Sequence, residues 1–288
     1  MKISKAFTVA ILGMILTFSC VRASFGQWVK DTPFNVITYN IRMNTPADGV
    51  NAWPLRKNKV AALLKFHQAD IFNVQEALPE QMDDRASSFP GFSHVGVGRD
   101  DGIRKGEHMA IFFNKARFEK LKDGMFWLSE SPDKPGLGWD AACNRTVTWI
   151  KLNDKITQKT FYVFDTHFDH MGNKAREESA NLILKSIKEI NKDNLPLILT
   201  WDFNLTKKSL PIQIILKVLN DAQDKSQTLP YGQEGTSGGF DVKVMPEKID
   251  FVFINEKVRI LRHGVLSDSF GLFYPSDHLP VLVEVKIN

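Results

Sequence analysis

The sequence predicts an α/β fold, in which helices cover the faces of β-sheets. Runs of apolar and β-branched residues alternate along the chain with stretches in which apolar residues recur at helical spacing. The composition, 43% hydrophobic and 24% charged over 288 residues, is that of an ordinary globular protein with one large core. The composition includes 18 Gly, 13 Pro and 2 Cys, and it excludes a collagen-like, coiled-coil, disulfide-rich or wholly disordered protein.

Strands are predicted where short apolar and β-branched runs lie between polar or turn-forming residues. The predicted strands are residues 35–42, 69–75, 109–114, 146–152, 160–168, 195–203, 248–255 and 279–286. The predicted helices are residues 54–68, 80–89, 174–192 and 209–221. In the third helix Ala180, Ile183 and Ile187 recur at helical spacing opposite Lys and Glu, so one face is expected to pack on a sheet.

Two strand–helix–strand units follow the same plan. The first runs from a strand ending at Asn40 through a helix to a strand ending at Glu76. The second runs from a strand ending at His167 through a helix to a strand ending at Asp202. Such crossovers join parallel strands, and open α/β sheets bind ligands at the carboxyl ends of their strands. Both units are therefore expected to deliver polar groups to the edge of a sheet where a ligand binds.

The N-terminus predicts an exported protein. A short cationic start, residues 1–5, precedes an apolar run over residues 6–18 that is too short to span a bilayer as a helix. We expect residues 1–23 to be a signal peptide and residues 24–288 to form the catalytic domain, in a periplasmic or secreted protein. Cys20 offers an alternative, a lipid-anchored N-terminus, but Phe18 fits a lipobox poorly. After cleavage only Cys143 remains, which leaves no intramolecular disulfide.

The charge balance gives no argument for a nucleic-acid partner. The full chain carries 37 basic and 33 acidic residues, a formal net charge of +4. Removal of residues 1–23 takes away Lys2, Lys5 and Arg22 and no acidic residue, so the mature net charge is 34 minus 33, or +1. A nucleic-acid-binding protein is expected to be more basic than this.

Asp202 and Asn204 are candidates for positioning a water molecule. They close an apolar strand two residues apart, so strand alternation places both side chains on one side. A carboxylate and a carboxamide held together can orient and deprotonate water. The alternative is a turn built on Asx residues, which are frequent at such places.

Asp277 and His278 form a second candidate pair, directly before the last predicted strand. An Asp beside a His can supply a metal ligand or a charge partner next to a group that titrates near neutral pH. Asp250 lies near the start of another predicted strand and could hold the imidazole in one tautomer. His167 and Arg145 add an imidazole and a planar fork that could clamp a phosphate.

These acidic, amide and imidazole groups suit hydrolysis of phosphate esters. A hard divalent cation prefers carboxylate and amide oxygens and offsets phosphate charge, while a neighbouring base orients water for in-line attack. The sequence contains no phosphate-binding P-loop, no Gly-x-Ser-x-Gly elbow and no dinucleotide-binding fingerprint.

In order along the chain, six short motifs resemble the successive motifs of the endonuclease/exonuclease/phosphatase superfamily. They are Thr38-Tyr39-Asn40-Ile41-Arg42, Val74-Gln75-Glu76, Thr166-His167-Phe168-Asp169-His170, Asp202-Phe203-Asn204, Ile249-Asp250-Phe251 and Ser276-Asp277-His278-Leu279-Pro280. The likeness runs from about residue 34 to the C-terminus. Segments between the motifs are similar to a bacterial branch of the same superfamily.

The resemblance implies a four-layer α/β sandwich, in which two packed mixed β-sheets lie between helices. It also implies Mg²⁺ or Mn²⁺ bound chiefly by Glu76, with Asn40 and Asp277 close by. Asp202 and Asn204 would then position and activate the attacking water.

In the same resemblance, His167 and Arg145 contact the substrate phosphate together with Asn204. His278, held by Asp250, stabilises the transition state or serves as the base. The choice between Asp202 and His278 as the base stays open at this point.

Two departures from the superfamily pattern concern the substrate. Trp201 stands where relatives usually carry Gly before Asp-Phe-Asn, and its ring could narrow the cleft or shift Asp202. The loop at residues 235–240 lacks the imidazole or amide that many relatives carry ahead of Gly-Phe.

The leading hypothesis is an exported, divalent-metal-dependent phosphoesterase that acts by direct attack of water. Its expected partner is a phosphoester substrate, which could be nucleic acid, a phospholipid head group or a small phosphoester. No obligate protein partner is evident, and a monomer is expected. The alternatives are a non-catalytic binding module for phosphorylated ligands and, less favoured, a zinc hydrolase that binds metal through His167 and His170.

Overall fold

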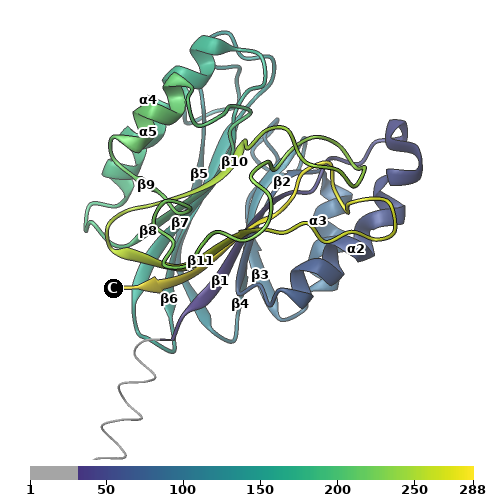
Figure 1. Ribbon diagram of the computed structural model, residues 1–288. Coiled ribbons are helices and arrows are strands. Elements are labelled where there is room, and N and C mark those ends of the chain that lie inside the picture. The colour runs from purple at the N-terminus through teal and green to yellow at the C-terminus, as the bar shows by residue number, and fades with distance from the viewer. Residues whose placement is uncertain (1–31) are drawn as a thin grey trace, which may run out of the picture.

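The computed structural model describes residues 32–288 as two six-stranded mixed β-sheets between helices. The predicted signal segment 1–23, with Cys20, lies outside the described residues. Figure 1 shows helices α4 and α5 on one side of the molecule and α2 and α3 on the other, with the sheets between them. The predicted α/β sandwich of four layers is confirmed.

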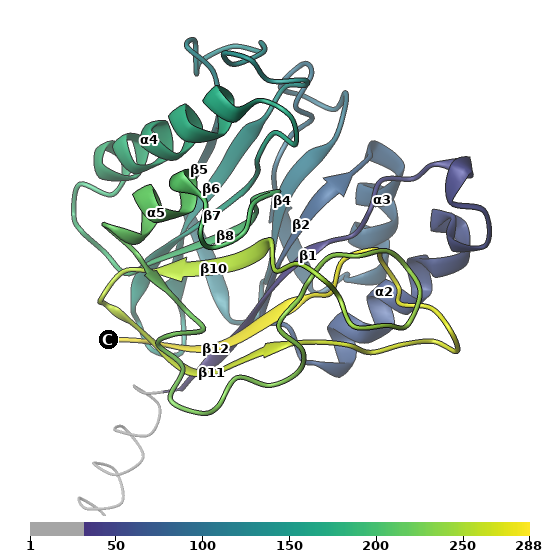
Figure 2. The same cartoon turned by 45° about the horizontal axis from the view of Figure 1, so that its top comes forward.

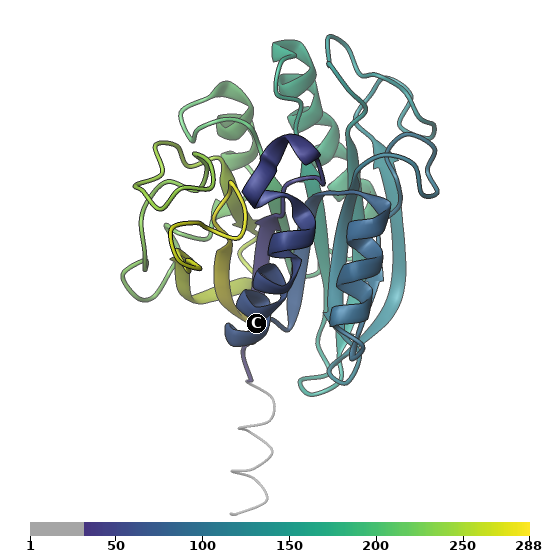
Figure 3. The ribbon, with the colours of Figure 1, turned by 90° about the vertical axis from the view of Figure 1, so that its right-hand side faces the viewer.

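The first sheet has the strand order β11-β12-β1-β2-β4-β3. Its strands are β1 (Phe34–Asn40), β2 (Ile71–Ala77), β3 (Phe92–Val95), β4 (His108–Asn114), β11 (Val258–Val265) and β12 (Val281–Ile287). A short 3₁₀ helix, η1 (Pro46–Asn51), leads into α2 (Trp53–Phe66), and α3 (Pro79–Ser88) follows β2. Figure 3 shows α2 and α3 lying in front of this sheet.

The second sheet has the strand order β5-β6-β7-β8-β10-β9. Its strands are β5 (Phe118–Trp127), β6 (Thr146–Asp154), β7 (Thr160–His167), β8 (Leu197–Asp202), β9 (Asn220–Asp221) and β10 (Asp250–Ile254). The helices α4 (Asn173–Ile190) and α5 (Leu210–Leu216) cover its outer face.

Strand alternation divides the buried side chains into three layers. On β1, Val36 faces the second sheet while Ile37 and Tyr39 face α2 and α3. On β7, Val163 faces the first sheet, whereas the neighbouring Phe164 packs toward α4. β1 and β7 therefore each carry two apolar faces, as expected for strands covered on both sides.

Both predicted crossovers join parallel strands. β1 pairs with β2 in parallel, and β7 pairs with β8 in parallel, with α2 and α4 as the respective connections. The carboxyl ends of these four strands therefore lie at the same end of the sandwich. In Figure 2, which brings the top of Figure 1 forward, β1, β2, β8 and β10 lie near one another at the centre.

Several elements differ from the sequence-based prediction. The strands β3, β5 and β11 were not predicted, and the helix expected over 209–221 ends at Leu216, before the short strand β9. β5 and β11 carry many charged residues because one face of each is exposed, which interrupts the apolar pattern. Within residues 32–288 the structure has no helix that combines the length and the hydropathy needed to cross a bilayer.

Candidate active site

Polar side chains from both sheets meet at the carboxyl ends of the parallel strands. Asn40 ends β1, Glu76 lies near the end of β2, His167 ends β7 and Asp202 ends β8. Asp250 begins β10, which runs antiparallel to β8, so its first residue pairs with Asp202 at the same end. The sequence-predicted strand ends are thus brought together in space.

Asn40 joins the two sheets at the centre of the site. Its side chain is fully buried, and its Nδ2 donates to Glu76 Oε1 at 2.9 Å and to Asp202 Oδ2 at 2.7 Å. Its Oδ1 accepts from the Arg42 N–H at 2.9 Å. One amide therefore fixes the separation of two carboxylates that come from different sheets.

Glu76 occupies an unusual backbone position. Its φ is +64°, and the pairing of β2 with β4 shifts register between Val74 and Ala77, which marks a β-bulge. The bulge turns the carboxylate toward the site, where Oε2 accepts from the Met43 N–H at 3.1 Å. Although burial disfavours the charge, the hydrogen bond from Asn40, the charge of His278 and the Met43 N–H lower the pKa of Glu76.

Asp250, His278 and Asp202 form a hydrogen-bonded and electrostatic chain. His278 Nδ1 lies 2.9 Å from Asp250 Oδ2, and His278 Nε2 lies 3.7 Å from Asp202 Oδ2. Burial opposes the imidazolium, but the two carboxylates outweigh it and raise the pKa of His278 well above its ordinary value. Burial also raises the pKa of Asp202, against the opposing influence of His278. The two neighbouring carboxylates therefore favour the protonated form of His278.

Asn204 and His167 form the other wall of the site. Asn204 Nδ2 lies 2.9 Å from His167 Nε2, and His167 Nε2 lies 3.5 Å from Asp202 Oδ2. Asn204 lies beyond the end of β8 with a φ of +52°, and its N–H donates to Asp202 Oδ1 at 3.0 Å. The Asx turn that was weighed as an alternative is thus real, and it is the turn that delivers Asn204 to the site.

Arg145 is buried and keeps hydrogen-bond donors that have no partner in the described residues. Its Nε and Nη1 are buried without a hydrogen-bond partner, its Nη2 lies 3.3 Å from His170 Nδ1, and its Nε lies 3.7 Å from Asp169 Oδ2. Burial, with the charges of Arg145 and His278, lowers the pKa of His167 well below its ordinary value. A buried guanidinium with free N–H groups is suited to bind an oxyanion.

Asp169 has a structural role. β7 ends at His167, and the Asp169 carboxylate accepts backbone N–H groups of residues 142, 143, 171 and 172 instead of facing the site. Despite burial, these bonds lower the pKa of Asp169 to about 2. The carboxylate therefore fixes two loops around Arg145.

Asp277 lies at the rim, where its carboxylate is 3.8 Å from Arg42 Nη1. Burial raises the pKa of Asp277, partly offset by the positive charge of His278, and Glu76 adds to the rise. A cation bound between Glu76 and Asp277 would relieve this repulsion.

Three groups of side chains in the described part of the chain could hold a metal ion by geometry. They are Glu76 with His167 and Asp202, Asp202 with Asp250 and His278, and Cys143 with Asp169 and His170. The first is rich in oxygen and includes the strained Glu76, which fits a hard divalent cation. None of these groups within residues 32–288 contains both His167 and His170, the two residues of the zinc alternative.

Trp201 does not narrow the cleft, and the expectation that it could was wrong. Its side chain is fully buried in the layer beneath α4 and α5, where it stacks on Phe203 at 3.7 Å and meets Phe168 edge-on at 4.2 Å. The reason is strand alternation, because Asp202 faces the site and its neighbour must face away. In the loop that lacks the imidazole, Ser237 Oγ lies 3.4 Å from His278 Nε2, a contact that the sequence analysis missed.

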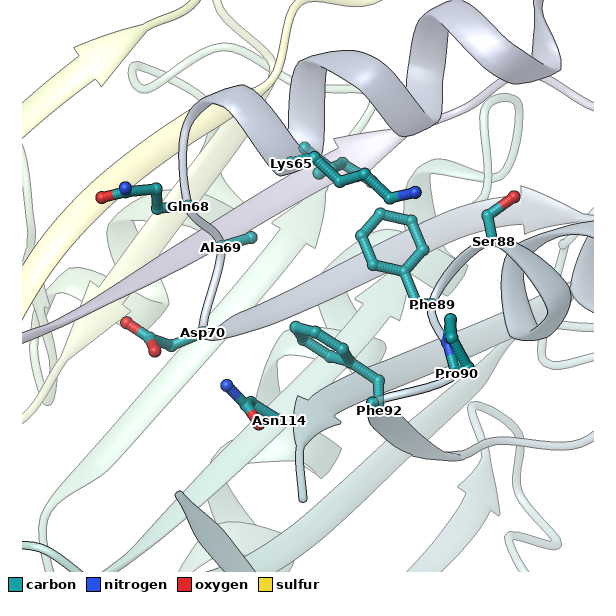
Figure 4. A pocket seen from close by; sticks show the side chains of 11 residues that line it. Lys65, Gln68, Ala69, Asp70, Ser88, Phe89, Pro90, Phe92 and Asn114 are labelled. Atoms are coloured by element: carbon teal, nitrogen blue, oxygen red, sulfur yellow. The ribbon is translucent and has the colours of Figure 1, made fainter. Parts of the chain in front are cut away.

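A pocket of about 380 Å³ lies at the opposite end of the first sheet, beside the amino end of β2. Figure 4 shows Phe89 and Phe92 in its wall, with the Lys65 ammonium 5.3 Å from the Phe89 ring. Asp70 also lines it, but this carboxylate already accepts the Asn35 N–H at 2.9 Å. The convergent polar side chains therefore define the candidate site, and this pocket is separate from it.

Comparison with known proteins places this geometry in a family. The family model described as endonuclease/exonuclease/phosphatase family matches residues 37–278. A solved structure of a family protein from Bacteroides thetaiotaomicron is 36% identical, covers 90% of this chain and 99% of its own, and superposes with a TM-score of 0.86. A mannosyl-6-phosphatase from the same organism is 37% identical over 88% of this chain and 99% of its own, with a TM-score of 0.85.

A curated relative, an uncharacterized protein of Acanthamoeba polyphaga mimivirus, is 25% identical over 174 residues. That match covers 58% of this chain and 65% of the viral protein. Since the family model covers most of the chain, and the Bacteroides structures match it over nearly their whole length, the chain belongs to the endonuclease/exonuclease/phosphatase family.

Proposed function

We propose that this protein is a divalent-metal-dependent phosphoesterase that cleaves a P–O bond by in-line attack of water. The observation that carries the proposal is the bridge made by Asn40, which holds Glu76 of the first sheet and Asp202 of the second within hydrogen-bond reach of one amide. A cation site and a base for water are thereby set side by side. Family membership supports a hydrolase.

The donor set fits Mg²⁺ or Mn²⁺, with Glu76 as the principal ligand and Asn40 and Asp277 nearby. A lowered pKa favours the ionised form of Glu76, and carboxylate oxygens are ligands that hard cations prefer. A bound cation would offset phosphate charge and stabilise the leaving oxygen.

The other site residues take the remaining roles in catalysis. The carboxylates of Asp202 and Asp250 favour a proton on His278, so His278 serves as a cation that stabilises the developing phosphate charge. Asp202, whose pKa burial raises, is a stronger base than an ordinary carboxylate and takes the proton of the attacking water. Asn204 orients that water, and Arg145 with His167 binds the phosphate oxygens.

The substrate panel follows from the relatives and from the charge. A Bacteroides protein of 37% identity carries the name mannosyl-6-phosphatase, which makes mannose 6-phosphate a first substrate to test here. The mature net charge of +1 gives no long-range attraction for nucleic acid. Bis(p-nitrophenyl) phosphate, p-nitrophenyl phosphate, sphingomyelin and single-stranded DNA complete the panel.

The test is hydrolysis of this panel with Mg²⁺, Mn²⁺ or Ca²⁺, or with chelator, by wild type and by Glu76→Gln and His278→Gln. We expect metal-dependent turnover that falls by about 10²-fold or more in both variants. Asp221→Asn is a matched control, because Asp221 is a buried carboxylate of the second sheet that pairs with Lys207 at 2.9 Å. Turnover that persists with chelator, or that both site variants retain in full, would contradict the proposal.

A further inference from the structure

We propose that Asp165 is a positioning residue of the active site, whose carboxyl couples the two sheets and thereby fixes Glu76 relative to Asp202. The inference rests on the proposed function for its kinetic readout. The side-chain hydrogen bonds of Asp165 go to Gln75 and Thr200, which are neither metal ligands nor predicted substrate contacts, so its effect on turnover acts through other residues.

Asp165 accepts hydrogen bonds from both sheets at one oxygen. Its Oδ1 accepts from Gln75 Nε2 of β2 at 2.6 Å and from Thr200 Oγ1 of β8 at 2.8 Å. Gln75 Nε2 also donates to Thr38 Oγ1 of β1 at 3.1 Å, and Asn73 Nδ2 donates to Thr200 Oγ1 at 2.5 Å. All five side chains are buried to within 1% exposure, so water does not compete for these bonds.

We call these five side chains (Thr38, Asn73, Gln75, Asp165 and Thr200) the polar tier, and three of them stand directly behind a site residue on their own strand. Thr38 precedes Asn40 by two positions, Asp165 precedes His167 by two, and Thr200 precedes Asp202 by two. Side chains two apart share a face of a strand, so the tier lies one step deeper between the sheets than the site. Because the tier and the site lie on the same strands, a displacement of one sheet past the other at the tier also displaces the site residues of the two sheets relative to each other.

Gln75 carries the coupling to Glu76. The φ of +64° at Glu76 is a strained conformation for a residue with a Cβ, and such strain persists only where the surroundings over-determine it. Glu76 is fixed on one side by the bonds of its carboxylate to Asn40 and Met43. On the other side it is fixed by its neighbour Gln75, whose amide is bound to Asp165.

The Asp165 carboxyl meets the polar tier through one of its two oxygens. Burial raises the pKa of Asp165 well above its ordinary value, and the charge of Asp202 adds to the rise. Its Oδ2 is buried without a hydrogen-bond partner, and so are Gln75 Oε1 and Asn73 Oδ1. The bonds from Gln75 and Thr200 to Oδ1 are therefore the contacts through which Asp165 couples the two sheets.

The test compares Asp165→Asn and Asp165→Leu with a matched control, Thr148→Val. Thr148 is buried on β6 and its Oγ1 donates to the Met109 carbonyl of β4 at 2.6 Å, so it also bonds across the sheets, but to no member of the tier. For each protein the measurements are kcat, KM, Mn²⁺ affinity by calorimetry and Tm without metal.

We expect Asp165→Asn to keep kcat within about threefold, because the Asn side-chain oxygen supplies the same acceptor for Gln75 and Thr200. Asp165→Leu should lower kcat by about 100-fold, the cost of a displacement near 1 Å, and weaken Mn²⁺ binding. Its KM should change by less than about threefold, since the phosphate contacts remain. Thr148→Val should lower Tm to a similar extent and leave kcat and Mn²⁺ affinity unchanged.

The proposal is overturned if Asp165→Leu matches Thr148→Val in kcat and Mn²⁺ affinity, or if Asp165→Asn loses as much as Asp165→Leu. Should Asp165→Leu fail to fold, Gln75→Met removes the same bond from the other sheet and must lower kcat in the same way. A wild type that binds Mn²⁺ but turns over nothing overturns the proposed function alone, and Mn²⁺ affinity then decides the role of Asp165. A wild type that neither binds Mn²⁺ nor turns over any substrate overturns both the proposed function and the role of Asp165.

Discussion

Replacement of Asp250 by Asn should move the alkaline limb of the pH–rate profile to lower pH. His278 lies between two carboxylates, which raise the pKa of its imidazole against the effect of burial. If the imidazolium stabilises the transition state, the rate falls as pH rises through its pKa. Asn keeps the size of the Asp250 side chain and an acceptor for the imidazole, but removes its charge.

The size of the shift follows from the 2.9 Å separation of His278 Nδ1 and Asp250 Oδ2. Coulomb's law at that distance, with an effective dielectric constant of about 20, gives roughly 6 kcal/mol as an upper figure. Opposite charges this close shift a pKa by about 1–3 units in practice, because burial and solvent reorganisation offset part of the attraction. We therefore expect the limb to move down by about 1–3 pH units.

The assay is kcat/KM against pH with an activated phosphodiester and saturating Mn²⁺, for wild type, Asp250→Asn and the control Asp221→Asn. A bound cation lowers the pKa of His278 in all three proteins, so the difference between profiles is the diagnostic quantity. Titration of the His278 imidazole by NMR in the metal-free proteins reads the same shift without turnover. An active Asp250→Asn enzyme whose alkaline limb coincides with that of wild type would refute the assigned role of His278.

Three further predictions test other parts of the structure. Arg145→Lys should raise KM for a phosphomonoester by roughly 10-fold to 100-fold, because Lys lacks the planar guanidinium that supplies the two free buried N–H groups. Steady-state kinetics measures this KM, and an unchanged KM would contradict the assigned role of Arg145. Burial lowers the pKa of His263 to about 4, so as pH drops the imidazole is protonated in the unfolded chain before it is protonated in the folded protein. The free energy of unfolding therefore falls as pH drops from about 6.5 toward 4, by up to about 3 kcal/mol. Urea unfolding at pH 7 and pH 5 should show a smaller loss for His263→Phe than for wild type, and equal losses would contradict this account. Intact-mass measurement of the exported protein should give a chain beginning at Ser24, whereas a lipid-modified Cys20 or an uncleaved chain would contradict the predicted signal peptide.

The positions of the site residues could be predicted because strand ends are visible in the sequence. An apolar run that stops at a polar residue, such as Val74 before Glu76 or Leu199 before Asp202, marks both the strand and its carboxyl end. The parallel pairing of β1 with β2 and of β7 with β8 then followed from crossover length alone. The local periodicity of apolar residues was thus sufficient to predict most of the fold.

The parts that could not be predicted depend on contacts between distant segments. The positive φ of Glu76 is set by bonds to Asn40 and Met43 that are more than 30 positions away, and nothing in the local sequence signals the bulge. The bond between Gln75 and Asp165 joins residues 90 positions apart on different sheets. By contrast, the direction of Trp201 was predictable, because a site-facing Asp202 requires its neighbour to face the helices.

The polar tier shows why stability and activity are opposed at this end of the molecule. Along β1 the inter-sheet face changes from Val36 to Thr38 to Asn40, and on β8 it changes from Ile198 to Thr200 to Asp202. Each buried oxygen without a partner costs about 1–3 kcal/mol, so an apolar tier would give a more stable sandwich. Such a tier would pack by shape alone and would specify no hydrogen-bond register between the sheets. Directional bonds such as that of Gln75 with Asp165 do specify it, and the strained Glu76 depends on that register. The stability given up between the sheets is therefore the physical counterpart of a site assembled from both of them.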